Sequence, residues 1–238
     1  MSSENWPAQF NLNELPTQTL KASTEEMIRH SLLNGDMKPG EIYSANALAK
    51  QLRISNSPVR EAMMSLVHRG LLELVRNRGF RVIDMSDKDR HEVYALRELI
   101  EVEAIRQIAH KGITPGQAHK LHELAVETLT TLTSSTGDTL HPYLDSDDRF
   151  HAYTISLLDN RRLAEIISNL RDQSRINDVY KYLPERGLLM PSAQEHIEMA
   201  TAIASQDANR AAEIMHNHLQ YARPTGRETI SRSVPTAT

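Results

Sequence analysis

The spacing of apolar residues changes character once along the chain, near residue 84. Before it, three stretches with helical spacing, at 19–34, 44–52 and 55–69, are followed by two short strand-like runs at 72–75 and 80–83. After it the spacing stays helical, over 87–111, 114–133, 142–158, 161–182, 192–204 and 207–221. The pattern predicts a mainly α protein, in which a small mixed domain is followed by an all-helical antiparallel bundle.

The third predicted helix carries polar residues on one face and apolar residues on the other. Ser55 can cap it, and Asn56 and Arg60 lie four residues apart on the exposed face. The buried stripe consists of Val59, Met63, Leu66 and Val67. A tight turn at Arg53-Ile54 joins it to the preceding helix, and a basic turn at 76–79 joins the two strands. This order is that of a winged helix-turn-helix, a fold that reads duplex DNA.

The formal net charge of −4 is distributed unevenly. Between Arg53 and Arg81 there are six arginines against Glu61 and Glu73, so this segment carries +4 and the remainder −8. A basic domain on an acidic body is typical of a protein that binds phosphate groups through one domain only. The alternative is an ordinary solvated surface.

The composition, 39% hydrophobic and 24% charged, is that of an ordinary globular protein. Since there is no cysteine, disulfides, cysteine nucleophiles and thiolate zinc sites are excluded. No apolar run approaches the ~20 residues that span a bilayer, so we expect no membrane segment and a cytoplasmic location. Residues 17–83 should form the DNA-binding domain and 84–223 the helical domain, between a flexible arm (1–16) and a disordered tail (224–238).

Four polar residues fall on apolar faces of the helical domain. Asp147 and His151 lie in the apolar stripe of helix 142–158, and His196 and His218 lie in those of the last two helices. A buried carboxylate is costly unless it is paired or binds a cation. One carboxylate and three imidazoles suit a divalent transition metal. Each histidine can instead be a core residue satisfied by a neighbour, and Asp147 and His151 can form a helix-stabilising pair.

The N-terminal motifs resemble those of the GntR superfamily of bacterial transcription regulators. They are Lys38-Pro39-Gly40, Leu48-Ala49, Ser57-Pro58-Val59-Arg60-Glu61-Ala62, Gly70-Leu71 and Asn77-Arg78-Gly79-Phe80. The resemblance implies DNA contacts from Asn46, Asn56, Ser57, Arg60, Arg78 and Gly79, the last two in the minor groove. Asn46 and Asn56 stand where relatives usually have Arg, and Arg53 stands where they have Gly. We therefore expect an operator that differs from the family's commonest one.

The helical domain resembles the FCD domain of FadR-type GntR regulators over residues 87–221. The matching residues are Asp147, Phe150, His151, Glu195, His196, Ala202, Asp207, Ala211, Met215, His218 and Leu219. In metal-binding members of that family one Asp and three His are the ligands, and they match Asp147, His151, His196 and His218. The resemblance thus implies a divalent transition metal such as zinc or nickel.

Arg97 matches the family position at which an arginine faces the ligand cavity, and a guanidinium suits a carboxylate effector. The alternative is a surface pair with Glu101. Arg171 and Arg175 are further candidates for effector binding that the sequence does not orient.

The predicted protein is a homodimeric transcription regulator and not an enzyme. It binds a pseudo-palindromic double-stranded operator and senses a small organic acid through its metal. Two rival hypotheses stay open at this point. One is a metal-dependent hydrolase with Asp148 as general base, and the other is a regulator whose metal is purely structural.

Overall fold

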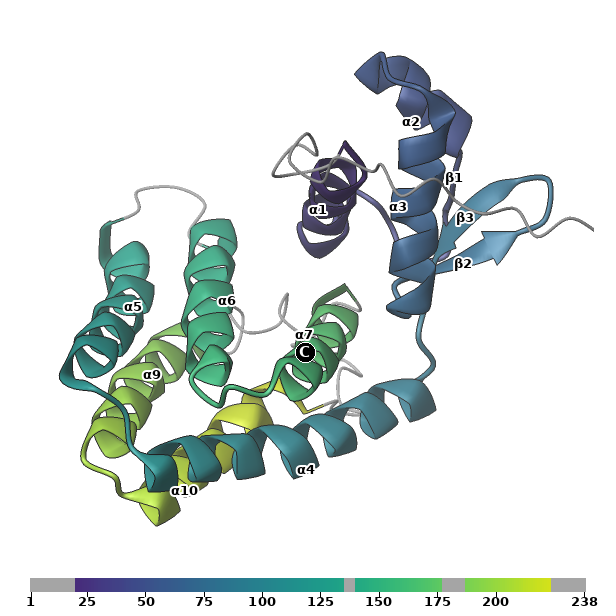
Figure 1. Ribbon diagram of the computed structural model, residues 1–238. Coiled ribbons are helices and arrows are strands. Elements are labelled where there is room, and N and C mark those ends of the chain that lie inside the picture. Colours follow the sequence, from purple (N-terminus) through teal and green to yellow (C-terminus); the bar gives the residue numbers. More distant parts are fainter. Residues whose placement is uncertain (1–19, 135–139, 177–186, 224–238) are drawn as a thin grey trace, which may run out of the picture. The chain divides into compact units, whose positions relative to one another are not determined.

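The computed structural model describes residues 20–134, 140–176 and 187–223. The predicted arm (1–16) and tail (224–238) lie outside these residues. The chain divides into two units (Figure 1). The main division falls between Val82 and Ile83, and the short segment Leu33–Gly35 groups with the second unit. The predicted fold class is confirmed, because a helix-turn-helix unit is followed by a helical one.

Helices and a small sheet make up the described part of the first unit. Its elements are α1 (Leu20–Leu33), β1 (Ile42–Tyr43), α2 (Ala45–Leu52), α3 (Asn56–His68), β2 (Leu72–Val75) and β3 (Gly79–Val82). β3 lies between β1 and β2, and both pairings are antiparallel. β1 is an addition to the predicted two-stranded wing. Its two residues pair with Phe80 and Arg81, and a strand this short is not visible as an alternating pattern.

The core of the first unit forms beneath α3. Val59, Met63 and Leu66 are fully buried, as their helical spacing predicts, whereas Val67 is only half-buried. Leu32 of α1 and Phe80 of β3 are buried as well. Each such side chain contributes about 1.5–3 kcal/mol through the removal of its apolar surface from water.

The turn of the helix-turn-helix contains one residue in the left-handed region. Ser44 caps α2 by accepting a hydrogen bond from the Ala47 N–H (3.4 Å). Arg53 ends α2 with a φ of 56°, a conformation that glycine adopts without strain. Ser55 occupies the N-cap position of α3, as predicted, but its side chain makes no capping hydrogen bond.

Gly79, at the start of β3, lies where the sheet requires a residue without a side chain. Its φ is +130°, and a Cβ at this position would approach the carbonyl oxygen of Tyr43 to 2.4 Å. Because β1 passes so close, glycine is required here by the fold, whatever its contact with DNA.

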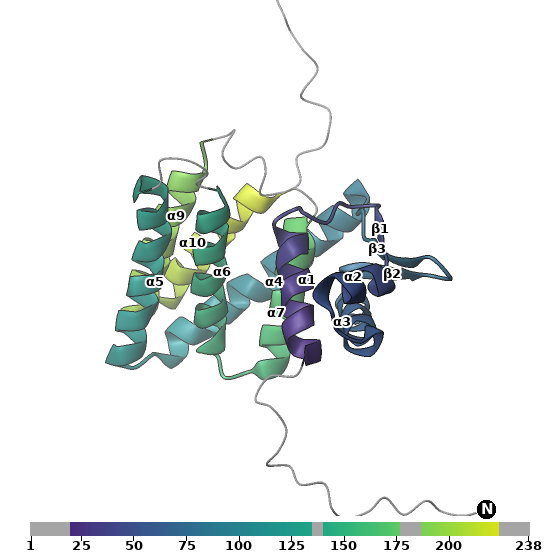
Figure 2. The ribbon, with the colours of Figure 1, turned by 90° about the horizontal axis from the view of Figure 1, so that it is seen from above.

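The second unit is helical throughout its described part. Its elements are α4 (Asp87–Lys111), α5 (Pro115–Ser134), α6 (Leu140–Ser156), α7 (Arg161–Ile176), α9 (Leu189–Ala204), α10 (Ala208–Leu219) and the short 3-10 helix η3 (Gln220–Ala222). α4 packs against α10 and α7, while α5 packs against α9 and α6 (Figure 2). Within the residues described, none of the helices combines the length and apolarity that crossing a membrane requires.

Helix starts in the second unit agree with the sequence in some places and differ in others. Thr114 and Gln117 have the spacing of a capping box, and they form one at the start of α5. Ser192 and Glu195 have the same spacing, which predicts a second capping box, but this prediction is wrong. α9 begins three residues earlier, at Leu189, and the buried Ser192 hydroxyl accepts a hydrogen bond from the Tyr143 hydroxyl (2.7 Å). The last part of the predicted helix 161–182, residues 177–182, lies outside the described residues.

Candidate metal centre

Three helices of the second unit bring four candidate ligands together. Asp147 and His151 come from α6, His196 from α9 and His218 from α10. Their side chains are buried, and one ligand atom from each lies within 4.8 Å of the others. Asp147 and His151 are one turn apart on α6 and so lie on the same face of that helix. The polar residues that the sequence places on the apolar faces of three helices thus form a single cluster.

The spacing of the ligand atoms matches a coordination shell. The Oδ1 of Asp147 lies 3.4 Å from His196 Nε2 and 3.6 Å from His151 Nε2. The Nε2 atoms of His151 and His218 are 3.2 Å apart. Ligands at 2.0–2.1 Å from a tetrahedral zinc ion lie about 3.3 Å from each other. These three spacings are close to that value, so the four residues could hold a metal ion.

The ring of His196 is held with its Nε2 directed into the cluster. Its Nδ1 lies 3.1 Å from the Thr128 hydroxyl oxygen. That hydroxyl donates its own proton to the Ala125 carbonyl (2.7 Å), so it accepts from Nδ1–H. Nε2 consequently carries the lone pair, and it has no hydrogen-bond partner among the described residues. A buried nitrogen whose lone pair accepts no hydrogen bond is suited to bind a metal ion.

Burial and nearby charges shift the pKa values of three residues of the cluster, Asp147, His151 and His196. Burial lowers the pKa of His196 to about 4 and holds the pKa of His151 well below its usual value. Burial by itself would raise the pKa of Asp147, but His151 and the Arg171 guanidinium outweigh it and lower that pKa well below its usual range. At neutral pH His151 and His196 are therefore neutral imidazoles and Asp147 is an ionised carboxylate, the forms that bind metals.

Asp147 divides its two carboxylate oxygens between the cluster and a buried arginine. Its Oδ2 accepts a hydrogen bond from Arg171 Nη2 (2.8 Å), and Arg171 Nη1 lies 3.5 Å from Glu101 Oε2. Glu101 Oε1 in turn accepts from Arg97 Nε (2.6 Å). The predicted pairing of Arg97 with Glu101 thus exists, but its surface location is wrong, because both side chains are only 1% exposed.

Arg175 is directed elsewhere in the same unit. Its Nη1 lies 3.1 Å from Asp148 Oδ2 and donates to the Leu144 carbonyl (3.2 Å). Its place among the effector-binding residues is supported only by its burial. Asp148, the predicted general base of the hydrolase hypothesis, is thus paired with Arg175 and is not one of the four clustered residues.

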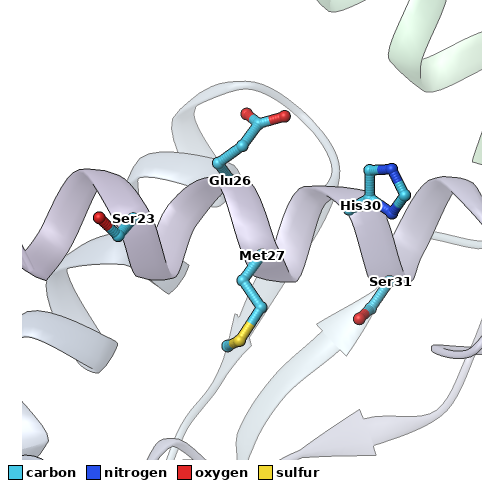
Figure 3. A pocket seen from close by; sticks show the side chains of 5 residues that line it. All are labelled: Ser23, Glu26, Met27, His30 and Ser31. Carbon is cyan, nitrogen blue, oxygen red and sulfur yellow. The ribbon is translucent and has the colours of Figure 1, made fainter. Parts of the chain in front are cut away.

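The residues expected to contact DNA lie in the first unit. Asn46 is exposed on α2, Asn56, Ser57 and Arg60 are exposed on the first turns of α3, and Arg78 is exposed in the hairpin turn. The Ser57 hydroxyl donates to Glu61 (2.8 Å), and the Arg60 guanidinium lies 6.0 Å from the centre of the Phe80 ring. Figure 3 shows a pocket along α1, whose lining residues include none of the predicted site residues.

The sequence indicates no role at the cluster for three residues that lie around it: Thr128, Glu101 and Glu195. Glu195 lies 3.2 Å from His218 Nδ1 through its Oε2. Its position next to His196 was a possible signal, but the local pattern favours a capping role instead. Thr128 and Glu101 carry no signal of their own, because only the packing of α5 and α4 brings them to the cluster.

The fold and this site define a DNA-binding transcription regulator with a ligand-binding domain. The model of the FCD domain matches residues 92–221, and that of the bacterial regulatory proteins of the gntR family matches residues 20–82. The chain belongs to the GntR family and carries a C-terminal FCD domain. It is a regulator and not an enzyme, so the hydrolase hypothesis is wrong.

Relatives of the chain are regulators as well. It is 24% identical over 208 residues to the transcriptional repressor RspR of Escherichia coli, covering 86% of this chain and 88% of RspR. It is 28% identical over 145 residues to the uncharacterised regulator YdhC of Bacillus subtilis, covering 61% of this chain and 63%, less than two thirds, of YdhC. The solved structure of E. coli McbR/YncC superposes with a TM-score of 0.73 at 23% identity, over 85% of this chain and 94% of that one. At this identity the likeness shows the fold alone.

Proposed function

We propose that the protein is a homodimeric regulator whose FCD domain binds a divalent transition metal and senses a small carboxylate through it. The observation that carries the proposal is the convergence of Asp147, His151, His196 and His218 in one buried cluster. A cluster of this composition suits zinc or nickel. When bound, such an ion supplies a Lewis-acid position at which a carboxylate can bind.

The arginines of α4 and α7 support a carboxylate effector. Arg97 and Arg171 are buried and meet at Glu101, so this part of the domain already holds one carboxylate between two guanidiniums. An effector that brings its own carboxylate competes with Glu101 for these donors. α4 starts five residues after the end of β3 and so follows the DNA-binding unit directly in the chain. A change in the pairing of Arg97 therefore acts on the helix that leads to the DNA-binding unit.

The contact with DNA is assigned to the exposed residues of the first unit. Arg60 and Asn56 enter the major groove, Ser57 and Asn46 approach the backbone, and Arg78 with Gly79 at the wing reaches the minor groove. Two copies would read a pseudo-palindromic operator. Leu96 and Leu99 on α4, 48% and 71% exposed, offer an apolar surface that a second copy can cover.

The proposal is tested by metal content and by DNA binding in the same preparation. Full-length protein is stripped with a chelator, reloaded with zinc or nickel, and titrated onto duplex DNA from upstream of its own gene. We expect one ion per chain and a DNA affinity that changes when citrate or malate is added to the metal-loaded form only. Protein that binds neither metal at micromolar concentration would end the proposal. If the metal is purely structural, it raises the melting temperature, and the DNA affinity of the metal-loaded protein does not change when citrate or malate is added.

A further inference from the structure

The outer side of His218 is contacted by Glu195 and Tyr221, to which the family resemblance gives no role at the metal. Glu195 Oε2 lies 3.2 Å from His218 Nδ1, and Glu195 Oε1 accepts a hydrogen bond from the Tyr221 hydroxyl (2.9 Å). Tyr221 belongs to η3, the 3-10 turn that follows α10. The three side chains form one chain of contacts that leads from the C-terminal end of the described residues to the cluster.

The contacts determine which nitrogen of His218 carries the proton. An ionised carboxylate only accepts hydrogen bonds, so Nδ1 must be the protonated nitrogen. Nε2 is left with its lone pair, and it faces His151 Nε2 at 3.2 Å. His218 is thereby held in the tautomer that a metal ligand needs.

Tyr221 keeps the carboxylate in place. The Tyr221 hydroxyl is the donor in this contact, because the carboxylate oxygen of Glu195 accepts its proton. Glu195 thus has one oxygen held by Tyr221 and the other directed at the imidazole, which limits its side-chain rotamers. The His218 and Tyr221 rings lie edge to face with centroids 6.0 Å apart.

The residues that orient His196 and His218 through Nδ1 differ in charge. His196 is oriented by the neutral hydroxyl of Thr128, whereas His218 is oriented by an anion. A carboxylate behind a metal-bound imidazole makes the ring a stronger electron donor and adds a negative charge near the ion.

From this geometry we infer that Glu195 and Tyr221 are positioning residues of the metal centre, which fix the tautomer of His218 and strengthen its bond to the metal. The inference rests on the proposed metal function and deepens it. It also gives the residues after α10 a part in metal affinity.

The test measures zinc affinity of the full-length protein by competition with a chromophoric chelator. We expect Glu195→Gln to weaken zinc binding by roughly 10–100-fold and Tyr221→Phe to weaken it by roughly 2–10-fold. The matched control is Glu198→Gln, on the same helix, where the exposed carboxylate pairs with Arg210 (3.0 Å). The zinc affinity of Glu198→Gln should stay within about twofold of that of the wild type, because exposed ion pairs contribute little.

The tautomer is read independently of the metal. The tautomer of His218 is measured by long-range proton–nitrogen NMR spectra of the protein, labelled with ¹⁵N-histidine and treated with a chelator. The His218 signals are assigned as those that are missing from the spectrum of His218→Gln. We expect the Nδ1-protonated form in the wild type and a mixture of both forms in Glu195→Ala. Wild-type affinity in Glu195→Gln together with an unchanged tautomer in Glu195→Ala would overturn the inference. If the wild type binds no zinc, the metal function fails, while the tautomer still decides whether Glu195 orients His218.

Discussion

Arg97 and Glu101 form a buried ion pair within α4, with Nε and Oε1 2.6 Å apart and both side chains 1% exposed. Through Arg171, the same glutamate is connected to Asp147 of the candidate metal cluster. α4, which follows the DNA-binding unit in the chain, and Asp147, a candidate metal ligand, therefore share one network of buried charges. Charges in such a network depend strongly on each other, because little water is present to replace a lost partner.

Glu101→Gln should destabilise the second unit. The substitution removes the charge that compensates two buried guanidiniums, and removing one partner of a buried pair costs roughly 3 kcal/mol or more. Urea denaturation of the metal-free protein measures the effect. Glu103→Gln is the matched control, because Glu103 pairs with Arg106 on the exposed face of the same helix, and solvent screening should keep its effect far smaller than that of Glu101→Gln. Equal effects in the two variants would contradict the importance of the buried pair.

Zinc should stabilise the wild type and fail to stabilise Asp147→Asn. A ligand present at 100 times its dissociation constant stabilises the folded state by about 2.7 kcal/mol. Asp147→Asn keeps the size of the side chain but removes the charge of a candidate ligand, so the rise in melting temperature with zinc should largely disappear. Asp148→Asn, one residue away and outside the cluster, should keep that rise. Calorimetry with and without zinc distinguishes the two.

Arg60→Ala should weaken binding to operator DNA by roughly tenfold or more and reduce its dependence on salt. The reason is the exposed position of Arg60 on the first turns of α3, where a recognition helix meets bases and phosphates. Fluorescence anisotropy at several salt concentrations provides the measurement. Arg106→Ala removes the same charge from the exposed face of α4 and should change neither quantity. A similar loss in both variants would point to a general effect of charge.

Gly79→Ala should be far more damaging than Gly40→Ala. Both glycines have positive φ, +130° and +80°, but a Cβ on Gly79 meets the Tyr43 carbonyl at 2.4 Å, whereas one on Gly40 meets nothing within 4 Å. The strain at Gly40 costs about 1–2 kcal/mol. Gly79→Ala causes the same kind of strain and must also displace β1. The Gly79→Ala variant should therefore melt at a clearly lower temperature than the Gly40→Ala variant. Comparable melting of the two variants would show that β1 moves aside easily.

Arg53→Gly should stabilise the first unit by roughly 0.5 kcal/mol. Relief of the left-handed conformation at φ 56° favours the folded state, and the greater freedom of glycine in the unfolded chain offsets part of the gain. Asn77→Gly, at a φ of 59°, should gain less, because asparagine tolerates this region. Chemical denaturation of both variants measures the difference, and a loss of stability in Arg53→Gly would contradict the expectation.

The sequence alone determined the order of the elements and the class of the protein. Helical spacing located α3 and α6 within a few residues, and it placed Asp147, His151, His196 and His218 on inward faces. These features are local, because the period of a helix is set by residues three and four positions apart.

The tertiary structure decided how the polar groups are paired. The sequence pattern favoured Glu195 as a helix cap and Glu101 as a surface residue, whereas the fold directs them to His218 and to two buried arginines. It likewise placed β1 against Gly79. Partners such as Glu101 and Arg171 are 70 residues apart in the chain, and no local spacing encodes a contact that depends on how two distant helices pack.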